Sequence, residues 1–256
     1  MQSKLGNSRI IAVMQPTYFP WLGYFDLIDQ SDVFILYNDV QLSKQSWQTR
    51  NRIPTANGIT LISLPIKKCA LDTIIKDAQI DNTKPWQKKL LRTMQLNYAK
   101  ASHFEEIYGW LSALLEQNYH SLQELNSTFI METAKKIGIN TQFHFSSELN
   151  INATDRVDRL IELSKKSSCN VYLSTTGSYG YLAEENGDNR FKEHGIILAF
   201  HNYKPVSYST GKLPFEPYMS VLDTLFHCGF VGTLEIIRAG RKSSLSFKEY
   251  NALQHE

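Results

Sequence analysis

Two short apolar runs separated by a turn-rich segment constrain the fold of this chain more than any other feature. The first run, 9–14, stops at Pro16, and the second, 32–37, ends at a polar Asn-Asp pair. Short apolar runs bounded by turn residues are typical of strands that are buried on both faces. Between them, residues 24–30 have the apolar spacing of a short helix. Strand, turn, helix and strand in this order predict a βαβ unit and a parallel sheet.

Strand-like and helical patterns continue along the rest of the chain. The expected helix at 121–137 ends at Gly138, a typical C-terminal cap. The expected strands are 59–66, 141–146, 171–174 and 196–200, and the expected helices are 85–96, 103–117, 121–137, 155–166 and 221–227. A further helix is expected to open after the small-residue loop that begins at Thr175.

These patterns predict an α/β, Rossmann-like fold, with a mainly parallel sheet flanked by helices. The 256 residues are enough for one ordinary domain with an appended lobe. We expect a single domain over residues 1–240 that includes a helical insertion or lid at about 84–138, followed by a polar C-terminal tail at 241–256.

The composition gives no support to several functional classes. A net charge of +2 and a pI of about 8.3 argue neither for nucleic acid nor for an anionic membrane. The cysteines form no CxxC pair and the histidines no HxH or HExxH pair, so we expect no metal site and no disulfide framework. No run approaches about eighteen apolar residues. We therefore expect a soluble, cytoplasmic protein without membrane insertion, and a homo-oligomer stays open.

Three stretches follow expected strands, and ligands of open α/β sheets bind at the carboxyl ends of strands. The first stretch is MQPTYFPWLGYF, residues 14–25. Its prolines fix the backbone, its glycine permits a close approach, and its aromatic rings can stack on a base or a sugar. The expected ligand-binding residues are Gln15, Tyr18, Trp21, Gly23 and Tyr24. A rigid packed corner explains the same residues equally well.

The second stretch, 38–52, combines a carboxylate with several cations and a tryptophan. Cations neutralise phosphate, an arginine can bind it with two N–H groups, and a carboxylate can hold an amine or Mg²⁺. These residue types predict a site for an anionic ligand, formed by Asp39, Gln41, Lys44, Trp47, Arg50, Asn51 and Arg52. The alternatives are a solvated charged loop and RNA binding, and the low net charge argues against RNA.

The third stretch is STTGSYGY, residues 174–181, at a strand-to-helix junction. Backbone N–H groups and hydroxyls at a helix N-terminus suit an anion, and the residues expected to supply them are Thr175, Thr176, Gly177 and Ser178. The stretch matches neither GxxxxGK[ST] nor GxGxxG. A well-capped helix start is the alternative.

One histidine has a spacing that suits proton transfer. His227 lies four residues after Asp223 on an expected helix, so the two side chains share a face and could deprotonate an amine. A structural helix pair is the alternative. No GxSxG motif is present, and no cysteine has a recognisable catalytic context.

Several long motifs resemble the WbqC-like protein family. They are MQPTYFPWLGYFDLIDQSDVF, NDVQLSKQSWQTRNRI, SLPIKK, YLSTTGSYGYL, AFHNYKPVSY and FEPYMSVLDTLFHCG, and they extend over nearly the whole chain. Members are bacterial and are often encoded in O-antigen or other surface-polysaccharide clusters, which implies work on nucleotide-linked sugars or their substituents. Many members have histidine at the position of Met14, so we expect no acid–base role there in this chain.

The order of the expected elements is also similar to nucleotidylyltransferase-type folds such as pantothenate synthetase. Those folds bind ATP between the first turn and a late Ser/Thr loop and form an acyl-adenylate, and STTGSYGY takes the place of that loop. Their HxGH-type histidines are absent from this chain. The likeness is an analogy of fold alone.

The family resemblance implies an enzyme of surface-polysaccharide precursor synthesis. It would be an acyl- or aminoacyltransferase that forms an amide on a nucleotide-linked amino sugar. The aromatic residues of the first stretch would form the pocket, the cations of the second would hold phosphates, and Asp39, or Asp223 with His227, would orient or deprotonate the amine. The alternatives are a ligase that consumes ATP with Mg²⁺ and a non-catalytic binding protein of glycan assembly. The sequence identifies no cofactor, sugar or donor.

Overall fold

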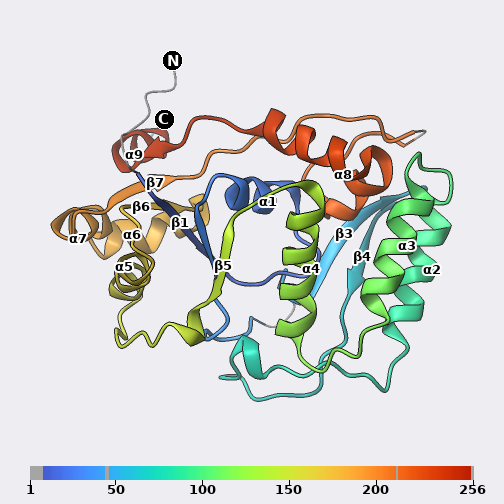
Figure 1. The fold of residues 1–256 in the computed structure, drawn as a ribbon, viewed down its shortest axis with the longest axis horizontal. Helices are drawn as coiled ribbons and strands as arrows, with labels where there is room; N and C mark the ends of the chain where they lie inside the picture. Colours follow the sequence, from blue (N-terminus) through green and yellow to red (C-terminus); the bar gives the residue numbers. More distant parts are fainter. Residues whose placement is uncertain (1–7, 44–45, 212, 255–256) are drawn as a thin grey trace.

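The core of the protein is a six-stranded sheet in the order β5-β2-β1-β6-β7-β8. The structure is a computed structural model and describes residues 8–43, 46–211 and 213–254. The strands are β1 (Ile10–Met14), β2 (Val33–Leu36), β5 (Gln142–Phe145), β6 (Val171–Ser174), β7 (Ile197–Phe200) and β8 (Leu245–Ser246). Every neighbouring pair is parallel except β7 and β8. This sheet, flanked by helices (Figure 1), confirms the predicted α/β, Rossmann-like fold.

Successive strand residues point to opposite faces of the sheet and build two cores. The register pairs Ala12 with Phe34, which belong to the first core, and Ile11 with Val33, which belong to the second. The helices of the first core include α1 (Leu22–Asp29), α4 (Leu122–Ile137) and α8 (Val221–Gly240). The helices of the second core include α5 (Arg156–Lys166), α7 (Gly187–Glu193) and α9 (Phe247–Leu253).

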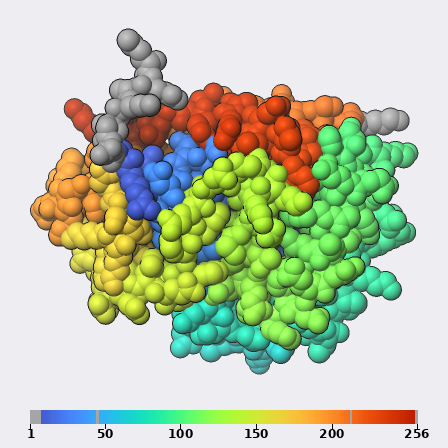
Figure 2. Space-filling model, in the orientation of Figure 1, coloured from blue at the N-terminus to red at the C-terminus, as the bar shows by residue number. Residues whose placement is uncertain are grey.

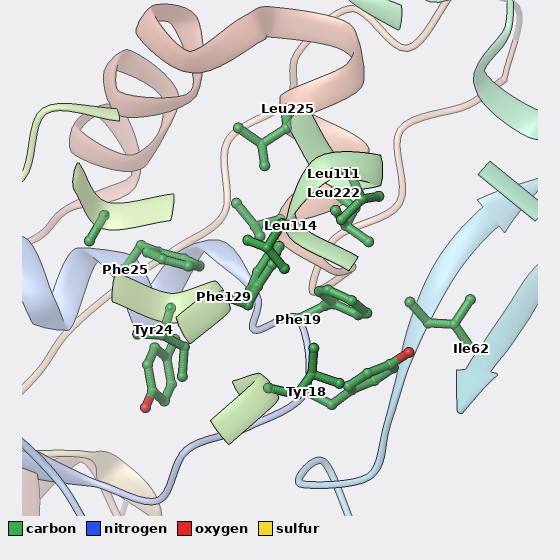
Figure 3. Packing of buried hydrophobic residues seen from close by; sticks show 14 of the residues in the cluster. Tyr18, Phe19, Tyr24, Phe25, Ile62, Leu111, Leu114, Phe129, Leu222 and Leu225 are labelled. Carbon is green, nitrogen blue, oxygen red and sulfur yellow. The ribbon is translucent and has the colours of Figure 1, made fainter. Parts of the chain in front are cut away.

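A separate antiparallel hairpin, β3 (Arg50–Thr55) and β4 (Gly58–Ser63), follows β2 along the chain. The helices α2 (Trp86–Tyr98), α3 (Phe104–Leu115) and α4 come next, and their buried side chains extend the first core. Phe129 of α4 packs edge-on against Phe19, with 4.4 Å between ring centroids, and lies near Phe25 of α1 (Figure 3). In the space-filling view, α4 and α8 cover much of the face turned to the viewer (Figure 2). The helical segment therefore shares a core with the sheet.

Three regions differ from the sequence-based expectation. Helix α8 consists of two helical segments that meet at Gly229, where the backbone is non-helical (φ 68°, ψ −175°). The first segment contains the expected helix at 221–227, and the second segment, up to Gly240, was not expected. After Gly240 the chain forms β8 and α9, and the Tyr250 ring stacks on Phe200 at 4.8 Å. Part of the expected polar loop is strand β3. The short elements are η1 (Ile75–Asp77), η2 (Ser146–Glu148), η3 (Thr176–Ser178) and α6 (Tyr179–Glu184).

Among the helices that the structure describes, none combines the length and the apolar character that crossing a membrane requires.

Candidate functional site

The segment that joins β1 to α1 is held rigidly by side-chain amides from other elements. Asn51 Nδ2 donates to the carbonyl oxygens of Tyr18 and Phe19 at 3.0 and 2.7 Å. Asn126 Nδ2 donates to the carbonyls of Pro16 and Gln48 at 3.0 and 2.9 Å. These bonds satisfy carbonyl groups that a helix or sheet would otherwise have to pair. They also support Phe19, which has a positive φ of 45°.

A cavity of about 310 Å³ opens beside this segment. Its lining comes from the first two stretches that the sequence singled out, together with one residue from the segment before α8. The lining residues are Met14, Thr17, Pro20, Trp21, Tyr24, Trp47, Asn51, Arg52 and Tyr218. Because Met14 is the last residue of β1, the cavity lies at the carboxyl edge of the sheet, where open α/β folds bind ligands. We call it the ring cavity.

Trp21 forms one wall of the ring cavity. Its ring centroid is 5.5 Å from that of Tyr203 and 5.3 Å from that of Tyr218, and its backbone forms a β-bridge with Ser220. The indole also lies across Gly23, where a Cβ atom would come within 2.2 Å of the ring. Gly23 therefore acts through Trp21: the absence of a side chain at this position leaves the room that the indole occupies.

Arg52 supplies the positive charge of the ring cavity. Its guanidinium carbon lies 5.2 Å from the ring centroid of Trp47, a cation–π contact. The Arg52 Nε atom is buried, and it has no hydrogen-bond partner among the described residues. Arg52 lines the cavity and forms no ion pair among the described residues, so its guanidinium charge is available to an anionic oxygen of a ligand.

The other aromatic and amide residues of the first stretch have different positions. Tyr18 is 1% exposed, packs in the core (Figure 3) and does not line the ring cavity. Tyr24 lines the cavity and donates its hydroxyl to the Gln15 carbonyl at 3.0 Å. The Gln15 side-chain oxygen accepts from Gln48 Nε2 at 2.5 Å. Gln15 therefore already has partners within the protein.

Arg50 and Gln41 lie apart from the ring cavity. Arg50 lines a second cavity on the hairpin, and Gln41 donates its Nε2 to the Leu71 carbonyl at 2.6 Å. Lys44 is outside the described residues. Of the cations expected to hold phosphate together, Arg52 is the one that lines the ring cavity in the described part of the chain.

Asp39 follows β2 and is bonded within the protein. Its carboxylate accepts from Arg159 Nη2 at 2.9 Å and from the Ser146 hydroxyl at 2.5 Å. The same arginine donates to the Tyr37 hydroxyl at 2.9 Å. Asp39 thus joins the ends of β2 and β5 to α5.

The Ser/Thr stretch follows β6, the neighbour of β1 at the point where the strand order reverses. It forms η3, and the hydroxyls of Thr175 and Ser178 lie 3.4 Å apart. Thr176 and Gly177 are exposed. In the described structure, none of these four residues lines the ring cavity.

Asp223 and His227 form the expected pair on α8, with 3.8 Å between Oδ1 and Nε2. Asp223 is 1% exposed and accepts from the hydroxyls of Tyr98 at 2.9 Å and Tyr208 at 2.5 Å. Burial raises the pKa of Asp223, although the two tyrosine hydroxyls and His227 oppose the shift. Burial lowers the pKa of His227, and the nearby Asp223 carboxylate opposes that shift.

A small cavity lies between the ring cavity and Tyr208, the tyrosine whose hydroxyl is bonded to Asp223. It is lined by residues that include Trp21 and Tyr218, which are also walls of the ring cavity, and by Tyr208 and Thr224. Its volume of about 10 Å³ is close to that of a single water probe. The Thr224 hydroxyl lies near that of Tyr208 but makes no hydrogen bond of normal geometry. The rings of Trp21 and Tyr218 therefore separate the ring cavity from the hydroxyl group that is bonded to Asp223.

Replacing Asp223 by asparagine is expected to change how stability depends on pH. The folded-state pKa of Asp223 is raised above 3.8, so its contribution to stability is fully present below pH 3.8 and is lost as the pH rises through the raised pKa. The free energy of unfolding of the wild type, relative to Asp223→Asn, should therefore fall as the pH rises from 3.8. Urea titrations at a series of pH values measure this difference.

The variant His227→Gln separates the two groups of this pair. The folded-state pKa of His227 is lowered, so its contribution is present above pH 6.5 and is lost as the pH falls through the lowered pKa. The two variants should thus change the pH profile with opposite slopes. If the free energies of unfolding of the wild type and of Asp223→Asn differed by the same amount at every pH, this would contradict the raised pKa of Asp223.

Sequence reasoning missed Tyr218 and Tyr203. Tyr218 is 52% exposed, lines the ring cavity and has a positive φ of 61°, which is unusual for an aromatic residue. Both tyrosines belong to the Pro/Tyr-rich segment that follows β7. This segment contains prolines and aromatic residues directly after a parallel strand. The same pattern identified the first stretch, 14–25.

A protein of Mycobacterium tuberculosis (strain ATCC 25618 / H37Rv), named uncharacterized protein Rv1507c, is 34% identical over 222 residues, which are 86% of this chain and 94% of that protein. No solved structure matches the chain. A family model matches residues 15–233, a range that contains most of the ring-cavity lining. The chain therefore belongs to the WbqC-like protein family.

Proposed function

We propose that the ring cavity binds a nucleotide-linked amino sugar and that the protein transfers an acyl or aminoacyl group to its amine. The observation that carries this proposal is the combination of the aromatic walls with the guanidinium of Arg52, which lines the cavity and is in no ion pair among the described residues. Aromatic rings stack on bases and sugars, and a guanidinium binds phosphate oxygens. The resemblance of the motifs to surface-polysaccharide proteins supports this class of substrate.

The shape of the ring cavity also supports a small-molecule ligand. Its volume of about 310 Å³ is within the usual range of such sites, and its exposed lining is mostly apolar with a few polar groups. Arg52 contributes its charged group from β3, an element of a hairpin, so its backbone position is fixed by the ladder with β4. Binding groups on a fixed backbone lose little entropy when a ligand binds.

Amide formation requires a proton acceptor. The amine nitrogen bonds to the acyl carbonyl carbon, the bond from that carbon to the donor's leaving group breaks, and the amine proton passes to a base. Asp223 suits this role better than Asp39. Tyr208, which is bonded to Asp223, reaches the cavity behind Trp21, whereas Asp39 is bonded to Arg159 and Ser146. The burial that raises the pKa of Asp223 makes its carboxylate a stronger base.

Replacing Arg52 by alanine is expected to weaken the binding of a nucleotide-linked amino sugar by at least about tenfold, the effect of one charge-assisted hydrogen bond. Calorimetric titration with UDP- and dTDP-linked amino sugars measures the change. Arg156→Ala is the matched control, because Arg156 also lies over an aromatic ring, Tyr181 at 4.9 Å, but does not line the ring cavity. Equal affinity of Arg52→Ala and wild type would contradict the proposed phosphate contact.

Product analysis tests the reaction. Wild-type protein is incubated with the amino sugar nucleotide and an activated acyl donor, and the amide is detected by mass spectrometry. Amide formed without ATP supports the transferase, and release of AMP or pyrophosphate from added ATP would indicate a ligase instead. Saturable binding without turnover of any donor would leave a binding protein.

A further inference from the structure

A second, larger cavity lies on the hairpin and has a different chemical character from the ring cavity. Its volume is about 450 Å³, and its lining includes Arg50 of β3 and the consecutive Lys67 and Lys68 after β4. The two cavities share no lining residue in the described structure. A ligand in one is therefore held by side chains that do not contact a ligand in the other.

The three cations of this cavity are uncompensated. Among the described residues, no aspartate or glutamate lines the cavity, and none of Arg50, Lys67 and Lys68 is in an ion pair. The chain as a whole has a net charge of only +2, so three cations without a neighbouring acid are a local concentration of charge. Like charges in a concave surface repel one another and attract anions from solution.

The backbone around these cations is fixed by hydrogen bonds. Arg50 lies directly opposite Ser63 in the hairpin register, and the Leu64 N–H donates to the Thr49 carbonyl at 2.8 Å. The Lys67 N–H donates to the Gln79 carbonyl at 2.9 Å. Thr49 and Ser63 also line the cavity, so hydroxyl donors accompany the charges. This set of donors matches the several oxygen atoms of a phosphate group.

We propose that this cavity, lined by Arg50, Lys67 and Lys68, is a second binding site, for the diphosphate group of a small phosphorylated ligand. A small ligand fits better than RNA, because no aromatic residue among those described lines the cavity, and single-stranded nucleic acid is held by aromatic stacking beside a basic groove. The site binds its ligand independently of the substrate proposed for the ring cavity.

Calorimetric titration with inorganic pyrophosphate and with ADP tests the site. The variant that combines Arg50→Ala with Lys67→Ala is expected to bind either probe at least about tenfold more weakly than wild type, from the loss of charge-assisted hydrogen bonds. Binding to wild type should also weaken as the salt concentration rises. Similar affinities for the two probes identify the diphosphate as the recognised group, and a much higher affinity for ADP adds a contact with its nucleoside.

Two controls make the result specific. Arg52→Ala removes a cation two residues away that lines the ring cavity, and it should leave pyrophosphate binding unchanged. Arg50→Lys, which keeps the charge, should retain part of the affinity. Three results would overturn the proposal: no saturable binding of pyrophosphate to wild type at millimolar concentration, an equal loss in Arg52→Ala, or displacement of pyrophosphate by a short RNA at far lower concentration. Because Arg52→Ala also tests the ring cavity with the sugar nucleotide, failure of one site is distinguishable from failure of the other.

Discussion

Replacing Asp26 by alanine should lower the free energy of unfolding by about 3–5 kcal/mol, the loss usually seen when one partner of a buried ion pair is removed. Asp26 is completely buried on α1, and its carboxylate lies 2.7 Å from Arg241 Nε and 2.7 Å from His201 Nε2. It also accepts from Gln30 Nε2 at 2.7 Å. Its removal would leave His201 Nε2 and Gln30 Nε2 without this acceptor, while Arg241 would lose one of two carboxylates and keep its pair with Asp29. Urea unfolding at neutral pH measures the change.

Two further variants identify the origin of the effect. Asp26→Asn keeps the shape of the side chain and part of its hydrogen bonding but removes the charge. It should therefore lower the free energy of unfolding by less than Asp26→Ala does, and its own loss measures the contribution of the charge. Lys192→Ala removes an exposed pair with Asp188, and such pairs contribute about 0.2–1 kcal/mol. If Asp26→Ala were no more destabilising than Lys192→Ala, the buried pair would contribute little to stability.

Gly23→Ala is expected to weaken binding of the proposed sugar nucleotide by at least about tenfold, because stacking on an aromatic ring contributes about 1–3 kcal/mol per base. The added Cβ would meet the Trp21 ring at 2.2 Å, so the indole must leave its position across the glycine. Alanine favours a helix over glycine by about 0.5–1 kcal/mol, which offsets part of the lost packing. We therefore expect the protein to stay folded. Calorimetric titration and near-ultraviolet circular dichroism measure the two effects.

Gly109→Ala is the matched control, since Gly109 also lies in a helix but a Cβ there would meet no atom within 4 Å. This variant should bind like wild type. A double-mutant cycle with Trp21→Ala tests whether Gly23 acts through the indole. If it does, Gly23→Ala has no further effect on binding once Trp21 is absent. Additive losses would show that Gly23 acts by some other contact.

The sequence predicted most of the fold because the apolar runs are short and turn or polar residues mark their ends. The βαβ unit at the start is bounded by proline and by polar pairs, and Gly138 ends α4 with a left-handed φ of 90°. The second helical segment of α8, which begins after Gly229, was not predicted. Gly229 ends the first segment with its non-helical backbone and lies beside His103, where a side chain would come within 2.6 Å of the imidazole. Tertiary packing therefore decides its conformation.

The sequence indicated where the ring cavity lies more clearly than which residues line it. The position of Trp21 and Arg52 at one cavity follows from strand exits, which the pattern of apolar runs identifies. Arg50 and Arg52 were expected together because both lie in the polar stretch 38–52. On β3 they are two residues apart and share a face, and their position along the strand decides which cavity each one lines. Tyr218 comes from a segment two hundred residues away, and only the long-range contact with Trp21 identifies it.

The bridge between Trp21 and Ser220 has a consequence for how the protein is synthesised. The Val221 N–H donates to the Pro20 carbonyl at 2.8 Å. The start of α8 therefore packs against the segment that contains Trp21, which is translated about two hundred residues earlier. At the opposite end of α8, Arg238 binds Asp29 of α1 at 2.9 Å. A nascent chain on the ribosome can thus pair β1 with β2 early, but the wall of the ring cavity that contains Trp21 is complete only after α8 has emerged.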